Sequence, residues 1–218
     1  MGSFITFEGV EGSGKSTQLR LAADRLAERA IPFVTTVEPG GTPLGQKIRD
    51  MLLNRGLDAP FPETELLLFC AARAQHVHEV IAPALATGKV VLCDRFADAT
   101  LVYQGYGRGL DKERILAINT FATGGVMPDL TLLFDLPVED GLERAFSRIA
   151  RNGSDQPEDR FERENRTFHD RIRAGYLAEA ARSPDRFRVL DAARPIPEIL
   201  TDVTACLEAH LRRRGYAL

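Results

Sequence analysis

The sequence lacks a disulfide framework, a long apolar run and a strong net charge, and each absence excludes a class of protein. Its three cysteines form no CxxC pair and are odd in number, so we expect a reducing cytoplasm. No apolar run is long enough to span a bilayer, and no basic–apolar–small secretory signal opens the chain, so we expect no membrane partner. The formal net charge of −3 argues against a nucleic-acid polymer as the main partner.

What the sequence contains instead is an alternation of strand-like and helix-like segments along all 218 residues. This alternation favours an α/β fold: one domain, residues 1–218, with a five-stranded parallel sheet and helices on both faces. The predicted strands are 3–7, 33–37, 89–93, 130–134 and 187–190. The predicted helices are 15–29, 44–54, 63–87, 112–122, 142–149, 162–181 and 197–213, with a polar loop at 151–159.

The strongest single signal is a glycine-rich segment between the first predicted strand and the first predicted helix. Its pattern, G-x-x-x-x-G-K-[ST], is the P-loop and predicts a P-loop NTPase-type fold. Glycines let backbone N–H groups converge on phosphates, and the helix N-terminus adds partial positive charge. We expect Lys15 to reach the β- and γ-phosphates and Ser16 to help hold Mg²⁺. The expected ATP-binding residues are Gly9, Val10, Glu11, Gly12, Ser13, Gly14, Lys15, Ser16 and Thr17.

Other features narrow the P-loop class. The guanine-reading tetrapeptide Asn-Lys-x-Asp of GTPases does not occur, and motor-type and helicase-type ATPases generally need longer chains. Asp94 and Arg95 follow the third predicted strand, at the edge where ligands bind in open α/β sheets. Asp94 can orient Mg²⁺ through water, and Arg95 can clamp a second phosphate group with its planar fork. The alternative for Arg95 is a structural salt bridge.

A series of motifs extends from the P-loop along nearly the whole chain. They are Phe7-Glu8-Gly9, Glu38-Pro39-Gly40-Gly41-Thr42, Phe69-x-x-x-Arg73, Asp94-Arg95, Tyr103-Gln104-Gly105, Pro128-Asp129-Leu130-Thr131 and Asp159-Arg160-Phe161-Glu162. In this order they resemble the bacterial thymidylate kinases, a family of P-loop nucleoside monophosphate kinases. The resemblance implies that the γ-phosphate of ATP is transferred to dTMP with Mg²⁺. It also implies a homodimer and a short lid at about residues 148–162.

Phe69 and Arg73 are four residues apart on a predicted helix, so they share one face. Taken alone, the pair fits a buried phenylalanine with a surface arginine over it. The resemblance implies instead that the ring stacks on thymine and the guanidinium bonds its carbonyl edge. It also places Gln104 at the base edge, and Tyr103 where a ribose 2′-hydroxyl would sit, which would select deoxynucleotides.

The resemblance completes the acceptor site with residues from several segments. Arg49 would grip the acceptor phosphate, and Thr100 would lie near the base. Ala99 departs from many relatives, which have a hydroxyl there. The residues expected to bind dTMP are Glu11, Glu38, Arg49, Phe69, Arg73, Arg95, Thr100, Tyr103 and Gln104.

Glu11 lies inside the P-loop, where a carboxylate is repelled by phosphates, so we expect it to point away from ATP. The resemblance implies that it faces the acceptor sugar and accepts a bond from the 3′-hydroxyl. Some relatives carry an arginine next in the loop, where this chain has Gly12. The resemblance implies that a lid arginine takes over, and the catalytic residues are then Lys15, Arg95, Arg148, Arg151 and Arg160. Alternatively, the lid arginines pair with Asp155, Glu158 and Asp159 on a solvated loop.

Two other functions remain compatible with these residues. A related deoxynucleoside kinase would phosphorylate thymidine itself and would need a carboxylate base at the 5′-hydroxyl. A nucleotide sensor would keep the phosphate cradle without turnover, although the intact Lys15, Asp94 and Arg95 argue against it. His76 and His78 point in different directions on their predicted helix, so we expect both at the surface and neither at a metal site.

Overall fold

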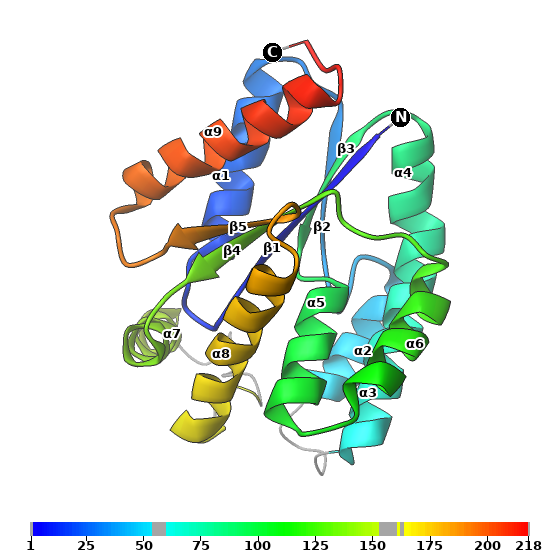
Figure 1. The fold of residues 1–218 in the computed structure, drawn as a ribbon, viewed down its shortest axis with the longest axis vertical. Helices are drawn as coiled ribbons and strands as arrows, with labels where there is room; N and C mark the ends of the chain where they lie inside the picture. Colours follow the sequence, from blue (N-terminus) through cyan, green and yellow to red (C-terminus); the bar gives the residue numbers. More distant parts are fainter. Residues whose placement is uncertain (1, 54–59, 153–160, 162–163, 218) are drawn as a thin grey trace.

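The computed structural model of the chain describes residues 2–53, 60–152, 161 and 164–217, without the side chains at 148, 149, 151 and 152. Its centre is a five-stranded, fully parallel sheet of order β2-β3-β1-β4-β5 (Figure 1). The strands are β1 Ser3–Gly9, β2 Phe33–Val37, β3 Val90–Asp94, β4 Leu130–Asp135 and β5 Phe187–Asp191. The predicted five-stranded parallel sheet is confirmed.

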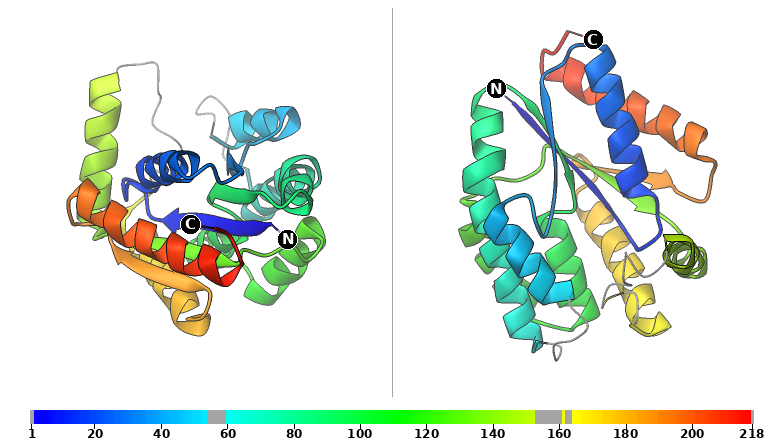
Figure 2. Two further views of the ribbon diagram at one scale, coloured as in Figure 1. Left: turned by 90° about the horizontal axis from the view of Figure 1, so that it is seen from above. Right: turned by 180° about the vertical axis from the view of Figure 1, so that it is seen from behind.

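Helices cover both faces of this sheet, as expected when parallel strands read as continuous apolar runs. The helices α1 Lys15–Glu28 and α9 Ile196–Arg213 lie together on one face (Figure 2). The opposite face carries α4 Ala82–Ala86, α5 Ala97–Thr100, the π-helix η2 Leu101–Gly107 and α8 Arg166–Arg182. Phe4 of β1 packs on Phe96 at the start of α5, while Phe7 stacks on Phe134 of the neighbouring strand β4.

The remaining helices are α2 Pro43–Leu53, α3 Pro62–His76, the π-helix η1 Val77–Ile81, α6 Lys112–Thr123 and α7 Val138–Asn152. The predicted helix 63–87 is thus helical throughout but divided by η1. Pro83 lies just after η1 and has no N–H to donate, so the hydrogen-bond ladder cannot continue unchanged through it. Helix α8 begins four residues later than predicted, because the Asn165 side chain caps it by accepting from Phe168 N at 2.9 Å.

The strand ends gather the functional segments at one edge. In the register of the sheet Phe7 lies opposite Asp94, and Gly9 lies opposite Phe134. The loop after β1, the Asp94-Arg95 pair after β3 and the cis Glu38–Pro39 turn after β2 therefore meet. None of the helices in the described ranges combines the length and apolarity that a membrane span needs.

Candidate active site

The P-loop joins β1 to α1 as the sequence predicts. Gly14 stands before the first turn of α1 in a left-handed conformation, and the Lys15 ammonium turns back to donate to Val10 O at 3.0 Å. Burial, and then the charge of Arg95, lower the pKa of Lys15 to about 8, although Asp94 and Glu11 oppose this. A bound polyphosphate would supply the negative charge that this buried lysine requires.

Gly12 explains why this loop carries no arginine. Its φ of 69° belongs to the left-handed region, and a Cβ there would lie 2.0 Å from the carbonyl oxygen of Gly141 on α7. Any larger side chain would push α7 away from the loop. Charge for the transferring phosphate must therefore come from elsewhere in the chain.

Asp94 is the last residue of β3 and Asp135 the last residue of β4, the two strands on either side of β1. The two carboxylates differ in their partners. The Ser16 hydroxyl donates to Asp94 Oδ2, which places two oxygen ligands beside the P-loop. Hydroxyl and carboxylate oxygens suit a hard cation such as Mg²⁺. Asp135 instead receives both Nε and Nη2 of Arg173, at 2.7 and 2.9 Å, and is neutralised. Of these two aspartates, Asp94 is the one whose surroundings suit a magnesium ion.

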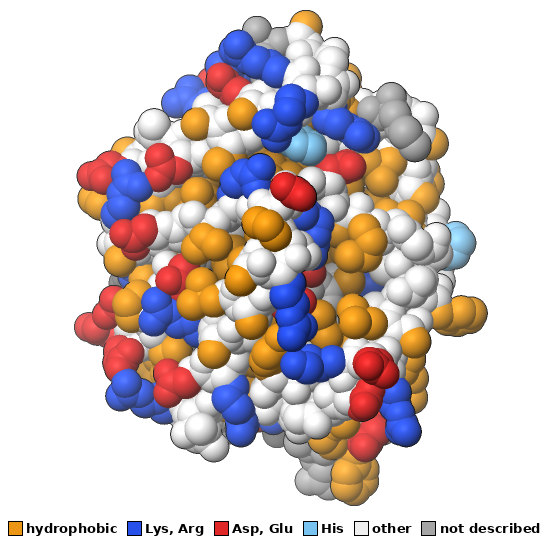
Figure 3. Space-filling model, in the orientation of Figure 1, with side chains coloured by type: hydrophobic (Ala, Val, Ile, Leu, Met, Phe, Trp, Pro, Cys, Tyr) orange, Lys and Arg blue, Asp and Glu red, His pale blue; other side chains and the backbone are white. Residues whose placement is uncertain are grey.

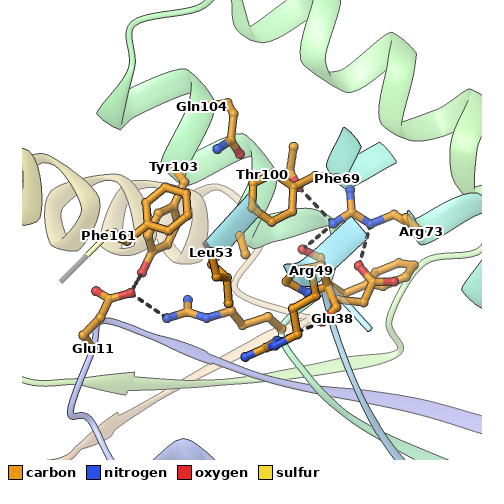
Figure 4. Close-up of a pocket in the computed structure, with 14 residues that line it drawn as sticks. Glu11, Glu38, Arg49, Leu53, Phe69, Arg73, Thr100, Tyr103, Gln104 and Phe161 are labelled. Atoms are coloured by element: carbon orange, nitrogen blue, oxygen red, sulfur yellow. Dashed lines mark hydrogen bonds and ion pairs between the residues drawn. The ribbon is translucent and has the colours of Figure 1, made fainter. Parts of the chain in front are cut away.

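Beside the P-loop lies a pocket with about 540 Å³ of empty space, part of it open to solvent (Figure 4). Its lining includes all nine residues predicted to bind dTMP, together with Pro39, Leu53, Phe96, Ala99 and Phe161. These residues come from segments as distant as the P-loop, β2, α3 and η2, so the fold brings the predicted set together. Leu53 and Phe161 were missed by sequence reasoning.

Arg73 is the most enclosed charged residue of this pocket, with only 2% of its surface exposed. It donates from Nε to Glu38 Oε2 at 2.8 Å, from Nη1 to Asn119 Oδ1 at 2.6 Å, and from Nη2 to Phe96 O and Thr100 Oγ1 at 3.1 and 2.9 Å. The alternative of a surface arginine over a buried phenylalanine is wrong. A guanidinium held by four acceptors is fixed in place before any ligand binds.

One residue of this arrangement, His76, was not assigned from the sequence. His76 is fully buried, with Nδ1 2.9 Å from Glu38 Oε1 and Nε2 2.6 Å from Thr36 Oγ1, so its expected surface position is wrong. His78 is exposed as expected. His76 lies three residues after Arg73 on the same helical face, a spacing that could have signalled their common partner Glu38.

The opposite wall of the pocket is formed by Glu11, Arg95 and Tyr103. Arg95, with a left-handed φ of 68°, donates from Nη2 to Glu11 Oε1 at 3.0 Å, and the Tyr103 hydroxyl donates to the same oxygen. Burial alone would raise the pKa of Glu11. His169, whose Nδ1 is 3.5 Å away, together with Arg95 holds that pKa well below its usual range. Arg95 thus forms the salt bridge considered for it while also lining the pocket.

Behind Arg95 stand two buried residues that sequence reasoning did not assign. The Tyr176 hydroxyl accepts from Arg95 Nη1 at 3.0 Å and donates to Glu8 Oε2 at 2.7 Å. Glu8 Oε1 accepts from Phe96 N, the residue after Arg95, at 2.8 Å. Burial and the nearby charge of Asp98 raise the pKa of Glu8 to about 7. The Glu8 carboxyl group therefore holds the chain just after Arg95 directly, through Phe96 N, and the Arg95 guanidinium through the Tyr176 hydroxyl.

A second and wider hollow, with about 1320 Å³ of empty space open to solvent, lies on the other side of the P-loop. The P-loop lines it together with Arg144, Ile199 and the segment 193–196 before α9. Gln18 on α1 donates to Ile196 O at 3.0 Å and so fixes this segment beside the loop. This segment was not assigned from the sequence, because it lies far from the P-loop along the chain.

The predicted lid arginines cannot be placed in either pocket. The side chains of Arg148 and Arg151, and the whole of Arg160, lie outside the described residues. Their catalytic role stays a prediction.

The pattern of residues 7–203 matches the family model of thymidylate kinases, which covers most of the chain. The chain belongs to the thymidylate kinase family. It is 56% identical over 205 residues to the thymidylate kinase of Desulfosudis oleivorans, a match that covers 94% of this chain and 96% of that one. It is 52% identical over 215 residues to the thymidylate kinase of Desulfovibrio desulfuricans, covering 99% of each.

Among solved structures, the thymidylate kinase of Ehrlichia chaffeensis matches with a TM-score of 0.74 and 33% identity. The match covers 94% of this chain and 98% of that one. The resemblance inferred from the motifs is therefore confirmed, both for the family and for the fold. As a member of the thymidylate kinase family, the protein is an enzyme that phosphorylates dTMP with ATP as the phosphate donor.

Proposed function

We propose that this thymidylate kinase transfers the γ-phosphate of MgATP to the 5′-phosphate of dTMP in the space between the two hollows, giving dTDP and ADP for dTTP synthesis. One observation carries this assignment of the site: all nine residues expected at dTMP line a single pocket whose Glu11–Arg95 wall adjoins Lys15. ATP would occupy the wider hollow along Gly9–Thr17, with its base toward Arg144 and residues 193–196.

The acceptor would lie across the pocket from its base end to its phosphate end. Phe69, Arg73, Thr100 and Gln104 form the base end. At the other end Arg95 would hold the 5′-phosphate, with Arg49, whose Nη1 donates to Pro39 O at 2.8 Å, as a second guanidinium (Figure 4). Two guanidinium groups match the charge of a phosphate monoester.

The reaction itself would need positioning and charge rather than a base. The acceptor phosphate oxygen is already anionic at neutral pH, so it can attack the γ-phosphorus in line without proton removal. Lys15 and Arg95 would neutralise the charge that spreads over the transferring group. We keep Arg148, Arg151 and Arg160 as the candidates for further positive charge from a lid over ATP.

Ser16 and Asp94 would hold the magnesium ion, Asp94 through water. The hydroxyl and the carboxylate are already in contact, and within the described ranges no cluster of three or more His, Cys, Asp or Glu side chains forms an all-protein metal cage. A cation bound mainly by water and substrate phosphates needs only this pair. The chemistry supplied by a bound ion there would be positive charge beside the phosphate oxygens.

Selection of a deoxyribose would fall to Tyr103 and Glu11. The Tyr103 hydroxyl is committed to Glu11, and its ring lies against Phe161 and under the Arg95 guanidinium, 4.9 Å from ring centre to Cζ. A ring held on three sides cannot turn aside for a 2′-hydroxyl. The Glu11 carboxylate, which lines the pocket beside Tyr103, would accept a bond from the 3′-hydroxyl.

The assay that tests this function measures ADP released from MgATP with dTMP, dUMP, dCMP, AMP, CMP and thymidine in turn. We expect dTMP to have the highest kcat/KM. Turnover with AMP or CMP and none with dTMP would contradict the assignment. Thymidine outperforming dTMP would favour the deoxynucleoside kinase, and binding of ATP without turnover of any acceptor would favour the nucleotide sensor.

A homodimer and a cytoplasmic location complete the proposal. Helices α3 and α6 lie side by side and expose Leu67, Leu116 and Phe121, the last with 88% of its surface exposed, which suits a second copy of the chain. Cys70, Cys93 and Cys206 are free thiols, as in a reducing compartment. Acidic side chains lie among the basic ones on the face in Figure 3, so we expect no nucleic-acid polymer as partner.

A further inference from the structure

Gln104, at the base end of the pocket, has an amide whose orientation is fixed by a residue outside the pocket. Its Nε2 donates to Glu65 Oε1 at 2.8 Å, and both side chains are buried. Gln104 comes one helical turn after Thr100, which accepts from Arg73, so these three polar groups share one end of the pocket. Figure 4 shows the Gln104 amide there, with its oxygen on the side of Thr100.

Glu65 can only accept from Gln104, because its carboxylate is charge-paired with Arg108 through both oxygens. Arg108 approaches it with Nε 3.3 Å from Oε1 and Nη2 3.4 Å from Oε2. Burial would lower the pKa of Arg108, but Glu65 and Glu164 raise it above its usual value, so the guanidinium keeps its charge. A carboxylate facing a guanidinium has no proton to offer. Turning the Gln104 amide around would therefore set two acceptor oxygens against each other.

The fixed amide presents an acceptor to the pocket. Among the described residues no donor is bonded to Gln104 Oε1, while Arg73 has one N–H of Nη1 beyond the four that donate to oxygen atoms of the protein. An acceptor beside a donor matches the edge of a 4-oxopyrimidine, which offers N3–H next to the O4 carbonyl. A 4-aminopyrimidine offers the reverse, an N3 lone pair next to an amino group.

We propose that Glu65 is a positioning residue that makes the enzyme selective for 4-oxopyrimidines over 4-aminopyrimidines, by holding Gln104 with its oxygen toward the base. This inference rests on the proposed placement of the base at Arg73 and Gln104. Thymine and uracil have the same N3–H and O4 groups and differ only in the 5-methyl group. The inference therefore separates discrimination against cytosine from discrimination against uracil. Glu65 governs dTMP against dCMP and has no part in dTMP against dUMP.

The direct test replaces Glu65 by Gln. The new carboxamide can present either its oxygen or its NH₂ group to Gln104, whereas both oxygens of the Glu65 carboxylate can only accept. The Gln104 amide is then no longer held in one orientation, and its amino group can face the pocket. We expect the ratio of kcat/KM for dTMP to kcat/KM for dCMP to fall about tenfold or more, the cost of a lost buried hydrogen bond. The ratio for dTMP to dUMP should stay near its original value.

Each ratio is measured on one preparation, so the fraction of folded enzyme cancels. The matched control is Glu63→Gln, an exposed glutamate on the same helix, which should change neither ratio. Glu65→Asp is the second variant: it keeps a charge for Arg108 but withdraws the carboxylate from Gln104, and it should also lower the dTMP/dCMP ratio. In a Gln104→Leu background, Glu65→Gln should have no further effect on that ratio.

Three results would overturn the inference: an unchanged dTMP/dCMP ratio in both Glu65 variants, an equal fall in Glu63→Gln, or an equal change in the dTMP/dUMP ratio, which would indicate a change of pocket shape. A wild-type enzyme that uses dCMP as well as dTMP would instead refute the proposed recognition of thymine. The two failures are therefore distinguishable.

Discussion

The two hollows beside the P-loop are built in different ways. The donor hollow is wide and is lined by the P-loop on one side and by residues 193–196 on the other. The acceptor pocket is smaller and is formed by side chains already bonded to one another, with Arg73 between Glu38, Asn119 and Thr100 and Arg95 between Glu11 and Tyr176. A nucleoside triphosphate can be held by backbone amides, whereas discrimination among monophosphates requires fixed side chains.

The largest effect on catalysis should come from removing the Lys15 ammonium on the donor side. Lys15→Ala removes the buried ammonium beside the transferring phosphate, and we expect kcat to fall by roughly 10³-fold while the Kd of dTMP changes little. Steady-state assays and dTMP titration calorimetry measure the two quantities. Lys47→Ala, an exposed lysine on α2, is the control. A Lys15→Ala enzyme with an unchanged rate would show that the donor site is wrongly placed.

Arg73→Ala should lower the stability of the folded protein, because Arg73 holds the acceptor pocket together. The substitution leaves the buried Glu38 carboxylate with His76 alone and removes the donor to Asn119. We expect a loss of about 3–5 kcal/mol in the free energy of unfolding, as for a broken buried ion pair. Urea denaturation measures it, with the exposed Arg114→Ala as control. A loss no greater than in the control would mean that the pocket is not held together by this arginine.

Glu8, behind the acceptor pocket, should make the stability of the protein depend on pH between about 4.5 and 7. Its pKa is raised from 4.5 to about 7 in the fold, so the folded state binds the proton more tightly than the unfolded chain. This contribution to stability is fully present below pH 4.5 and is lost as the pH rises through about 7, on the order of 3 kcal/mol in total. Glu8→Gln cannot titrate, so its stability should fall less between pH 5 and 8.

Equilibrium unfolding of the ligand-free enzyme at several pH values measures this slope, with the exposed Glu143→Gln as control. Parallel slopes for wild type and Glu8→Gln would contradict the assignment of the titrating group to Glu8.

The smallest effect should come from removing the Tyr176 hydroxyl, which links Arg95 to Glu8. Tyr176→Phe removes the hydroxyl between Arg95 and Glu8, and we expect kcat/KM for dTMP to fall about five- to tenfold with the KM of ATP unchanged. Tyr106→Phe is the matched control. Its hydroxyl also donates to a glutamate, Glu179, but lies away from Arg95. The same loss in an Arg95→Ala background would show that Tyr176 does not act through Arg95.

The difference between the two regions also explains what could be predicted from the sequence. The P-loop is contiguous, so its glycines and Lys15 were recognised directly, and the five strands followed from their apolar runs. The acceptor residues were reached only through family resemblance, because Phe69, Arg73 and Tyr103 are ordinary in their local context. Glu8, Glu65, His76 and Tyr176 could not be assigned, since their roles arise from contacts between segments far apart in the chain.

The most direct test of a prebuilt thymine pocket is a crystal structure of the enzyme with dTMP and without ATP. The account predicts thymine beside Phe69, with O4 toward Arg73 and N3 toward the Gln104 oxygen, the phosphate at Arg95, and the bonds of Arg73 to Glu38 and Asn119 unchanged. A nucleotide found instead along residues 193–196, or an Arg73 that leaves Glu38 to make room for the base, would contradict it.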